Sequence, residues 1–326
     1  MYNFMEKNNM FDHSQVDADL LILGAGPAGL AAAQYGSRAN LKVLAIEQMS
    51  PGGQALLIDK LENYPGDLNP RSGFDFAEDM RRQAENFGAK IIGDGVLSLE
   101  KTGGLFSVLL DSGRTLHAYA VILATGATHR SLGIPGEAEF AGRGVSYCAS
   151  CDGPFFKGKK ILVVGGGDAA CDEARYLSLL TDKVILAHRR DSFRAQKGVA
   201  QRVLENPRIE VRFNTRPVEI RGDKQVTAVL LEDSAAKKQY EEPADAVFIF
   251  AGTVPQIGFI PATWTQGAFT DKAGYIITDQ RMESAIPGLF AAGDVRASPF
   301  RQVVVAAAEG AIAAHCAAEY IDSLKA

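Results

Sequence analysis

The chain has 326 residues, of which 47% are hydrophobic and 22% are charged, and its formal net charge is −5. A chain of this length and composition can bury a large core, so we expect a globular protein of two domains. The negative balance offers no basic face for phosphates, and we therefore expect no nucleic acid partner.

Residues 1–15 are polar and lack the apolar core of a signal peptide, which predicts a flexible N-terminal tail. The nearly apolar run at 20–33 contains Pro27 and falls short of the roughly 18 to 20 residues of a membrane span. We therefore expect no transmembrane helix, no membrane partner and a cytoplasmic location. The chain has only 4 cysteines, too few for a disulfide scaffold.

Residues 18–48 read as a strand, a glycine turn, a helix of small residues and a second strand, which is a βαβ unit. The turn carries G-x-G-x-x-G at Gly24, Gly26 and Gly29, and Glu47 closes the second strand. Such glycines let the backbone approach a pyrophosphate, and such a carboxylate accepts hydrogen bonds from ribose hydroxyls. The pattern predicts a dinucleotide with an unphosphorylated ribose. The alternative is a turn that only packs helix on strand.

Short alternating strands follow at 89–127, and then the stretch VSYCASCDGPFF with Cys148 and Cys151. Structural zinc would need four ligands, and no second CxxC or paired His accompanies the pair, so we expect no metal. A crosslink over so short a loop would stabilise little, which favours a redox dithiol. Asp152 is a candidate proton shuttle, a role that would suit a raised pKa, although it also reads as a turn residue.

Residues 158–190 repeat the βαβ pattern, with Gly165, Gly167 and Ala170 in the turn GGGDAA. Its second strand ends in HRRDSFRAQK instead of an acid. Arg189 and Arg190, with Arg194 nearby, could hold a 2′-phosphate through forked hydrogen bonds, which favours NADPH over NADH. Two such bonds of about 1.5 kcal/mol each correspond to about a hundredfold preference. A solvated surface cluster is the alternative.

The second βαβ unit is also followed by short alternating strands, at 208–253, so two similar dinucleotide folds share the chain. The remaining strand GLFAAGD and an apolar helix from Val303 onward most simply complete the first fold. We therefore predict an α/β protein with two Rossmann-like, three-layer ββα domains, the second inserted in the first. The predicted domains are 16–128 with 254–326, and 129–253, which carries the CxxC.

Two nucleotide sites and one dithiol suggest an electron relay. A hydride leaves NADPH as an electron pair, a flavin can accept the pair, and a disulfide can terminate the transfer. This interpretation assigns the first site to FAD and the second to NADPH.

Eight motifs occur in the order GxGxxG, GGQ, ENYPG, ATGA, CASCDG, GGGDAA, HRRDSFRA and GDV…FRQ. Along most of its length the chain thereby resembles the bacterial-type, low-molecular-weight thioredoxin reductases of the FAD/NAD(P)-dependent pyridine nucleotide-disulfide oxidoreductase family. The resemblance implies a flavoprotein that reduces thioredoxin or a thioredoxin-like protein with NADPH, a homodimer, and a rotation of one domain against the other.

The resemblance also implies roles for individual residues. Cys148 would attack the substrate disulfide, and Cys151 would lie nearer the flavin. The expected FAD-binding residues are Gly24, Gly26, Gly29, Glu47, Gly53, Gln54, Asn63, Thr125, Gly126, Asp294, Arg301, Gln302 and Val303. The expected NADPH-binding residues are Gly165, Gly167, Asp168, Ala170, His188, Arg189, Arg190 and Arg194.

Two departures from the family pattern bear on these roles. Phe300 stands where Tyr usually precedes RQ, and Asp168 replaces a frequent Asn, which adds negative charge beside a pyrophosphate.

Four alternatives stay open. They are a flavin-dependent NAD(P)H oxidase, an alkyl hydroperoxide reductase flavoprotein, a reductase of another thioredoxin-like or peroxidase partner, and a non-enzymatic zinc-binding or nucleotide-binding module.

Overall fold

The structure is a computed structural model that describes residues 16–265 and 267–325, so the tail predicted at 1–15 lies outside the described residues. The chain forms two compact units, one ending at Ala127 and resuming at Val254, the other comprising Thr128–Thr253. The second unit is thus inserted in the first, and the predicted α/β fold class is confirmed. The chain passes from one unit to the other in strands β7 (Ala127–His129) and β16 (Thr253–Pro255). These two strands pair with one another.

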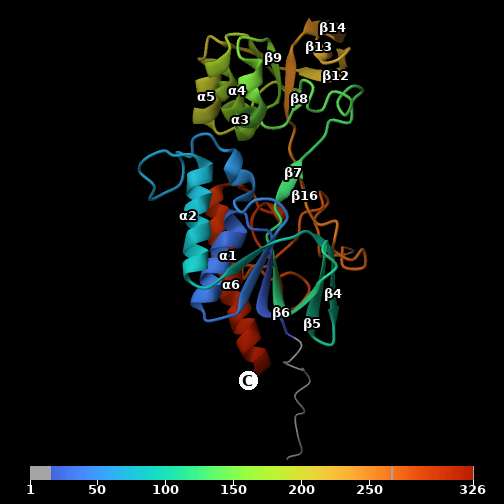
Figure 1. Cartoon of the computed structure of the whole chain (residues 1–326). Helices are drawn as coiled ribbons and strands as arrows, with labels where there is room; N and C mark the ends of the chain where they lie inside the picture. The colour runs from blue at the N-terminus through green and yellow to red at the C-terminus, as the bar shows by residue number, and fades with distance from the viewer. Residues whose placement is uncertain (1–15, 266, 326) are drawn as a thin grey trace, which may run out of the picture. The chain divides into compact units, whose positions relative to one another are not determined.

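The first unit contains a seven-stranded sheet with the order β3-β2-β1-β6-β5-β4, in which β17 also pairs with β6. Its strands are β1 (Ala18–Leu23), β2 (Val43–Glu47), β3 (Lys90–Gly93), β4 (Val96–Thr102), β5 (Leu105–Leu110), β6 (Thr115–Leu123) and β17 (Leu289–Ala291). Its helices are α1 (Pro27–Arg38), α2 (Gly73–Asn86) and α6 (Val303–Lys325). Strand β6 pairs with β5 in an antiparallel hairpin near its start and with β17 in parallel near its end. Within this unit α1, α2 and α6 lie side by side (Figure 1).

Strand β1 is apolar from Leu20 to Leu23 because both faces of the sheet are covered there. Leu20 and Ile22 join the buried cluster formed with α1 and α6. Leu21 and Leu23 point to the opposite face and join the cluster that contains Phe106 of β5. The glycine turn that follows β1 is therefore anchored on a strand buried on both sides.

The second unit also combines a sheet with packed helices, but its antiparallel strands form a sheet of their own. Its five-stranded parallel sheet has the order β11-β10-β9-β15-β8, and a separate antiparallel sheet has the order β12-β13-β14. The strands are β8 (Val145–Ser146), β9 (Ile161–Gly165), β10 (Val184–Ala187), β11 (Ile209–Arg212), β12 (Thr215–Gly222), β13 (Val226–Asp233), β14 (Lys238–Pro243) and β15 (Ala246–Phe250). The helices are α3 (Ala149–Asp152), α4 (Asp168–Leu180) and α5 (Lys197–Leu204).

Alternation along β9 explains these layers. Ile161 and Val163 pack with the helices, whereas Leu162 and Val164 pack with the antiparallel sheet. Because successive side chains of a strand face opposite sides, one apolar strand serves both layers.

Helix α6 is long and apolar enough to cross a membrane by length and composition, whereas the sequence interpretation, which weighed only the run at 20–33, expected no such helix. In the structure half of the most apolar window of α6 is buried. The helix packs directly on α1, where a Cβ added to Gly310 would overlap the carbonyl oxygen of Ala28. The apolar composition of α6 is thus that of a helix in the core of its unit.

This close packing predicts a stability loss for Gly310→Ala. The added Cβ meets backbone, which cannot move aside, so we expect the free energy of unfolding to fall by about 1–3 kcal/mol in urea titrations. Gly198→Ala in α5 is the matched control, since no atom of residues 16–265 and 267–325 lies within 4 Å of its added Cβ and no loss is expected. Equal losses in the two variants would contradict the close packing of α1 and α6.

Candidate functional site

The first glycine turn joins β1 to α1 and requires glycine at two of its positions. Gly24 has a φ of +99°, and its added Cβ would overlap the carbonyl oxygen of Ala124. A Cβ at Gly29 would overlap the carbonyl oxygen of Gly24. Gly26, which caps α1, has more space, because the nearest atom to its added Cβ is the Cα of Gly53 at 3.9 Å. The turn therefore exposes backbone at a helix N-terminus, where a phosphate can bind.

Glu47 lies at the end of β2, beside this turn. Its Oε2 accepts the N–H of Ala25 at 2.8 Å, and its Oε1 accepts the N–H of Met49 at 3.0 Å. A carboxylate has lone pairs for further bonds, so Glu47 can also accept from hydroxyls of a ligand. In the structure the bond from Ala25 to Glu47 holds the backbone of the turn in place.

Two further predicted segments are held by hydrogen bonds, one next to the turn and to Ala127, the other at Gln302 before α6. The N–H of Gly52 donates to the carbonyl of Ala25 at 2.7 Å, and the side-chain amide of Gln54 donates to the carbonyl of Ala127. The Asn63 amide donates to Oε1 of Gln302 at 3.0 Å, although the two are 239 residues apart in sequence.

The segment with Thr125 and Gly126 is held by a residue that the sequence interpretation missed. The Thr125 hydroxyl donates to the Gln256 carbonyl at 2.7 Å, and the Gln256 amide donates to the Thr125 carbonyl at 2.8 Å. In the part of the chain that the structure describes, no atom lies within 4 Å of a Cβ added to Gly126, so the backbone there is open on one side.

Asp294 and Arg301 lie near the start of α6. Burial raises the pKa of Asp294, Arg301 opposes this rise, and Glu309 adds to it. The Arg301 guanidinium lies 4.0 Å from the ring centroid of Tyr275. Its Nε is buried without a hydrogen-bond partner among the described residues. A buried, unsatisfied donor is costly unless a ligand accepts from it, so this site fits a bound polar group.

Glu309 is a second residue that the sequence interpretation missed. It is 6% exposed, accepts the N–H of Gly293 at 2.8 Å and pairs with Arg296. This carboxylate thereby fixes the loop that carries Asp294. One signal could have revealed it, because a lone acid within the Ala-rich stretch of α6 is unlikely to be buried without a partner.

The second glycine turn joins β9 to α4. Gly167 caps α4, and among the described residues no atom lies within 4 Å of its added Cβ, whereas a Cβ at Gly165 would come within 2.5 Å of the Cβ of Ala170. A Cβ at Gly166 would overlap the ring of His188, which is 5% exposed. The turn thus rests on His188 and leaves Gly167 open.

The Nε2 of His188 is buried and, like the Nε of Arg301, has no hydrogen-bond partner among the described residues. Burial lowers the pKa of His188, and the neighbouring Arg194, Arg190 and Arg189 lower it further. The ring is therefore neutral near pH 7, and its surroundings are positively charged.

The arginine loop is fastened to the turn at two points. The N–H of Arg194 donates to the Gly166 carbonyl at 2.7 Å. The backbone and side-chain amides of Gln196 donate to the Asp168 carboxylate at 2.7 and 3.0 Å. Asp168 therefore serves as an acceptor inside the protein, and no sequence pattern had marked Gln196 as its partner.

The three predicted arginines of this loop, Arg189, Arg190 and Arg194, are exposed. Within residues 16–265 and 267–325 none of their guanidinium groups forms an ion pair with a carboxylate. They are thus available to an anion beside the open end of the turn.

Cys148 and Cys151 form a disulfide, with Cα atoms 5.4 Å apart. Cys148 precedes α3, and its Sγ accepts the N–H of Cys151 at 3.2 Å. That N–H would stabilise a thiolate on Cys148 once the disulfide is reduced. The other two cysteines, Cys171 and Cys316, are buried free thiols, and burial raises the pKa of Cys171 to about 12. Only the pair in the CxxC motif is placed for redox chemistry.

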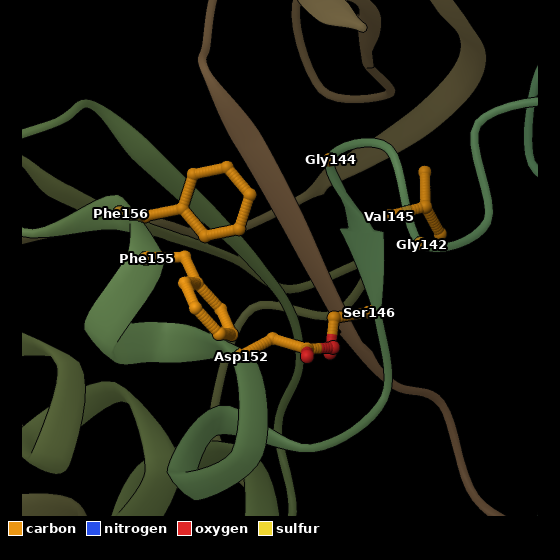
Figure 2. Close-up of a pocket in the computed structure, with 7 residues that line it drawn as sticks. All are labelled: Gly142, Gly144, Val145, Ser146, Asp152, Phe155 and Phe156. Atoms are coloured by element: carbon orange, nitrogen blue, oxygen red, sulfur yellow. The ribbon is translucent and has the colours of Figure 1, made fainter.

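A small hollow of about 180 Å³ is lined in part by Asp152, which directly follows Cys151 in the sequence. Its lining consists of Gly142, Gly144, Val145, Ser146, Asp152, Phe155 and Phe156. Figure 2 shows the Asp152 carboxylate and the Ser146 hydroxyl pointing toward one another. The Ser146 Oγ accepts the N–H of Cys148 at 3.1 Å, so the Ser146 hydroxyl contacts the backbone of the cysteine. Phe155 is 81% exposed.

Comparisons with known proteins agree with this geometry. Residues 18–310 match the family model described as pyridine nucleotide-disulphide oxidoreductase. The chain is 54% identical over 311 residues to the thioredoxin reductase of Treponema pallidum, covering 95% of this chain and 99% of that protein. It is 43% identical to that of Listeria innocua, covering 94% and 95%. The crystal structure of Lactococcus lactis thioredoxin reductase superposes with a TM-score of 0.90 at 38% identity, covering 94% and 100%.

Proposed function

Because the chain belongs to the pyridine nucleotide-disulphide oxidoreductase family, and within it to the thioredoxin reductases, we propose that it uses NADPH and FAD to reduce the disulfide of thioredoxin. The enzyme is an oxidoreductase that depends on a flavin and a nicotinamide nucleotide, and its protein substrate is thioredoxin. The observation that carries the finer proposal is the Cys148–Cys151 disulfide in the unit that also holds the arginine-lined glycine turn.

The first unit would hold FAD. The pyrophosphate would lie at Gly24, Gly26 and Gly29, and the ribose at Glu47. Asp294 and the buried Nε of Arg301 would form hydrogen bonds with polar atoms at the flavin end of FAD. When bound, FAD supplies the transfer of an electron pair between a nicotinamide and a disulfide.

The second unit would hold NADPH. The backbone at Gly167 would face the pyrophosphate, and Arg189, Arg190 and Arg194 would surround the 2′-phosphate. Arg side chains suit this task because they donate two parallel hydrogen bonds to a phosphate. Gln196 supports the preference by engaging the Asp168 carboxylate, so that the acid repels the phosphates less.

The dithiol would complete the transfer. Two electrons and two protons convert the Cys148–Cys151 disulfide to two thiols. The Cys148 thiolate attacks the thioredoxin disulfide and forms a mixed disulfide, and Cys151 then attacks Cys148 and releases the thioredoxin dithiol. Asp152 would protonate the departing thiolate or accept a proton as the enzyme disulfide re-forms.

The exposed ring of Phe155 beside the hollow offers a contact for the protein substrate, because exposed aromatic side chains next to a reactive group commonly anchor a partner. The family resemblance supports a homodimer, and the small number of cysteines, 4 in the chain, supports a cytoplasmic location.

The proposal is tested by mixing purified enzyme with NADPH or NADH and candidate thioredoxins, and following nicotinamide oxidation. We expect NADPH oxidation that depends on thioredoxin. If NADPH bleaches the flavin but no thioredoxin is turned over, the substrate is another thioredoxin-like or peroxidase partner. A preference for NADH would overturn the assignment of the arginines.

A further inference from the structure

A buried carboxylate lies at the start of the second unit and has no place in the chemistry above. Glu137 is 3% exposed. It accepts the N–H of Leu132 at 2.9 Å and the N–H of Gly133 at 2.7 Å. It also accepts the phenol O–H of Tyr147 at 2.7 Å. A buried acid with three donors holds its surroundings rigidly, because each donor would lose a charge-assisted hydrogen bond if it moved away.

Tyr147 makes one more contact with the same stretch of chain. Its ring stacks on that of His129, with centroids 3.7 Å apart and planes 16° apart. Tyr147 is half-buried and packs on the core that includes Phe140.

All of these contacts converge on one segment. Residues 129–133, from the last residue of β7 onward, are the stretch by which the chain enters the second unit. Tyr147 directly precedes Cys148, which the proposed function assigns as the nucleophile. The ring, the hydroxyl and the carboxylate therefore connect the entering segment to the backbone of the reactive cysteine.

We propose that Tyr147 is a positioning residue that, through its stack on His129 and its bond to Glu137, makes the placement of Cys148 depend on the conformation of the entering segment. This inference rests on the proposed function. Residues 129–133 hold Tyr147 from one side, and Tyr147 holds the peptide that places the Cys148 Sγ against the N–H of Cys151. Without the stack this peptide is more mobile. The N–H of Cys151 then stabilises the Cys148 thiolate less, and the thiolate is less well oriented for attack on the substrate disulfide.

His129→Ala tests the proposal, because this side chain is exposed and its loss should not unfold the unit. We expect the rate at which pre-reduced enzyme reduces thioredoxin to fall about fivefold, the scale of one aromatic stack. Flavin reduction by NADPH should stay within about twofold, since it does not use Cys148. His129→Phe preserves a stacking ring and should restore the rate.

A second measurement does not depend on turnover. Iodoacetamide alkylation of Cys148 in the reduced protein, followed by mass spectrometry, should be slower in His129→Ala than in wild type and normal in His129→Phe. Tyr147→Phe keeps the stack but removes the donor to Glu137, and it should also slow alkylation. Tyr240→Phe, on β14 of the same unit, is the matched control and should change neither rate.

The outcomes separate the inference from the function on which it rests. If wild-type enzyme fails to reduce thioredoxin, the proposed function is wrong, and alkylation still reports on Cys148. If His129→Ala and His129→Phe alkylate at the wild-type rate, or if His129→Ala slows flavin reduction as much as thioredoxin reduction, Tyr147 does not position Cys148.

Discussion

Replacing Cys148 by Ser is expected to lower NADPH-dependent thioredoxin turnover by more than about a thousandfold, the scale of losing a catalytic nucleophile. A serine hydroxyl cannot form the mixed disulfide, and no other described cysteine can substitute, because Cys171 and Cys316 are buried. Cys151→Ser should be equally inactive, since the mixed disulfide could not be resolved. The measurement is nicotinamide oxidation in the presence of thioredoxin.

The control for this result is Cys171→Ala, which should retain turnover. Flavin reduction by NADPH should survive in all three variants, because the residues around both glycine turns are unchanged. Full turnover in Cys148→Ser and Cys151→Ser would favour the alternative of a flavin oxidase, which transfers electrons to oxygen and needs no dithiol.

Removing both Arg189 and Arg190 by substitution with Ala is expected to raise the KM for NADPH about a hundredfold, from two charge-assisted bonds of about 1.5 kcal/mol each. The KM for NADH should change little, because NADH lacks the 2′-phosphate. Steady-state kinetics with both nucleotides at constant ionic strength provide the measurement, since salt weakens exposed charges.

Arg216→Ala is the matched control. Arg216 is an exposed arginine of the same unit that pairs with Glu232 on the antiparallel sheet. It should leave both KM values unchanged. A wild-type enzyme that uses NADH as well as NADPH, or a double variant with an unchanged NADPH KM, would mean that the arginine cluster is ordinary solvated surface.

Local patterns along the chain were enough to predict the fold class. Each strand–turn–helix unit is contiguous, and its glycines are required by close backbone contacts such as that of Gly29 with Gly24. The repeat of this pattern, with a final strand and helix left over, predicted the insertion of one domain in the other. The CxxC motif likewise contains its own chemistry, because both sulfurs lie within one turn of chain.

The apolar sequence of α6 shows what local patterns do not predict. By composition alone the helix resembles a membrane span, and its burial comes from packing on α1, β6 and β17 within its unit. A hydrophobic sequence reports that a segment avoids water, but it does not report what covers that segment.

The hydrogen bonds that hold the site residues in place depend on the tertiary structure. Glu309 holds the loop of Asp294, Gln196 engages Asp168, and Glu137 binds Tyr147. These partners lie on separate segments of the chain, and a buried polar group is satisfied by whichever donor or acceptor the packed fold brings to it. The sequence alone therefore determined the two folds and the reactive groups, which are built from local patterns. Tertiary packing alone determined the hydrogen bonds that fix those groups in place, because such bonds join residues that no spacing along the chain relates.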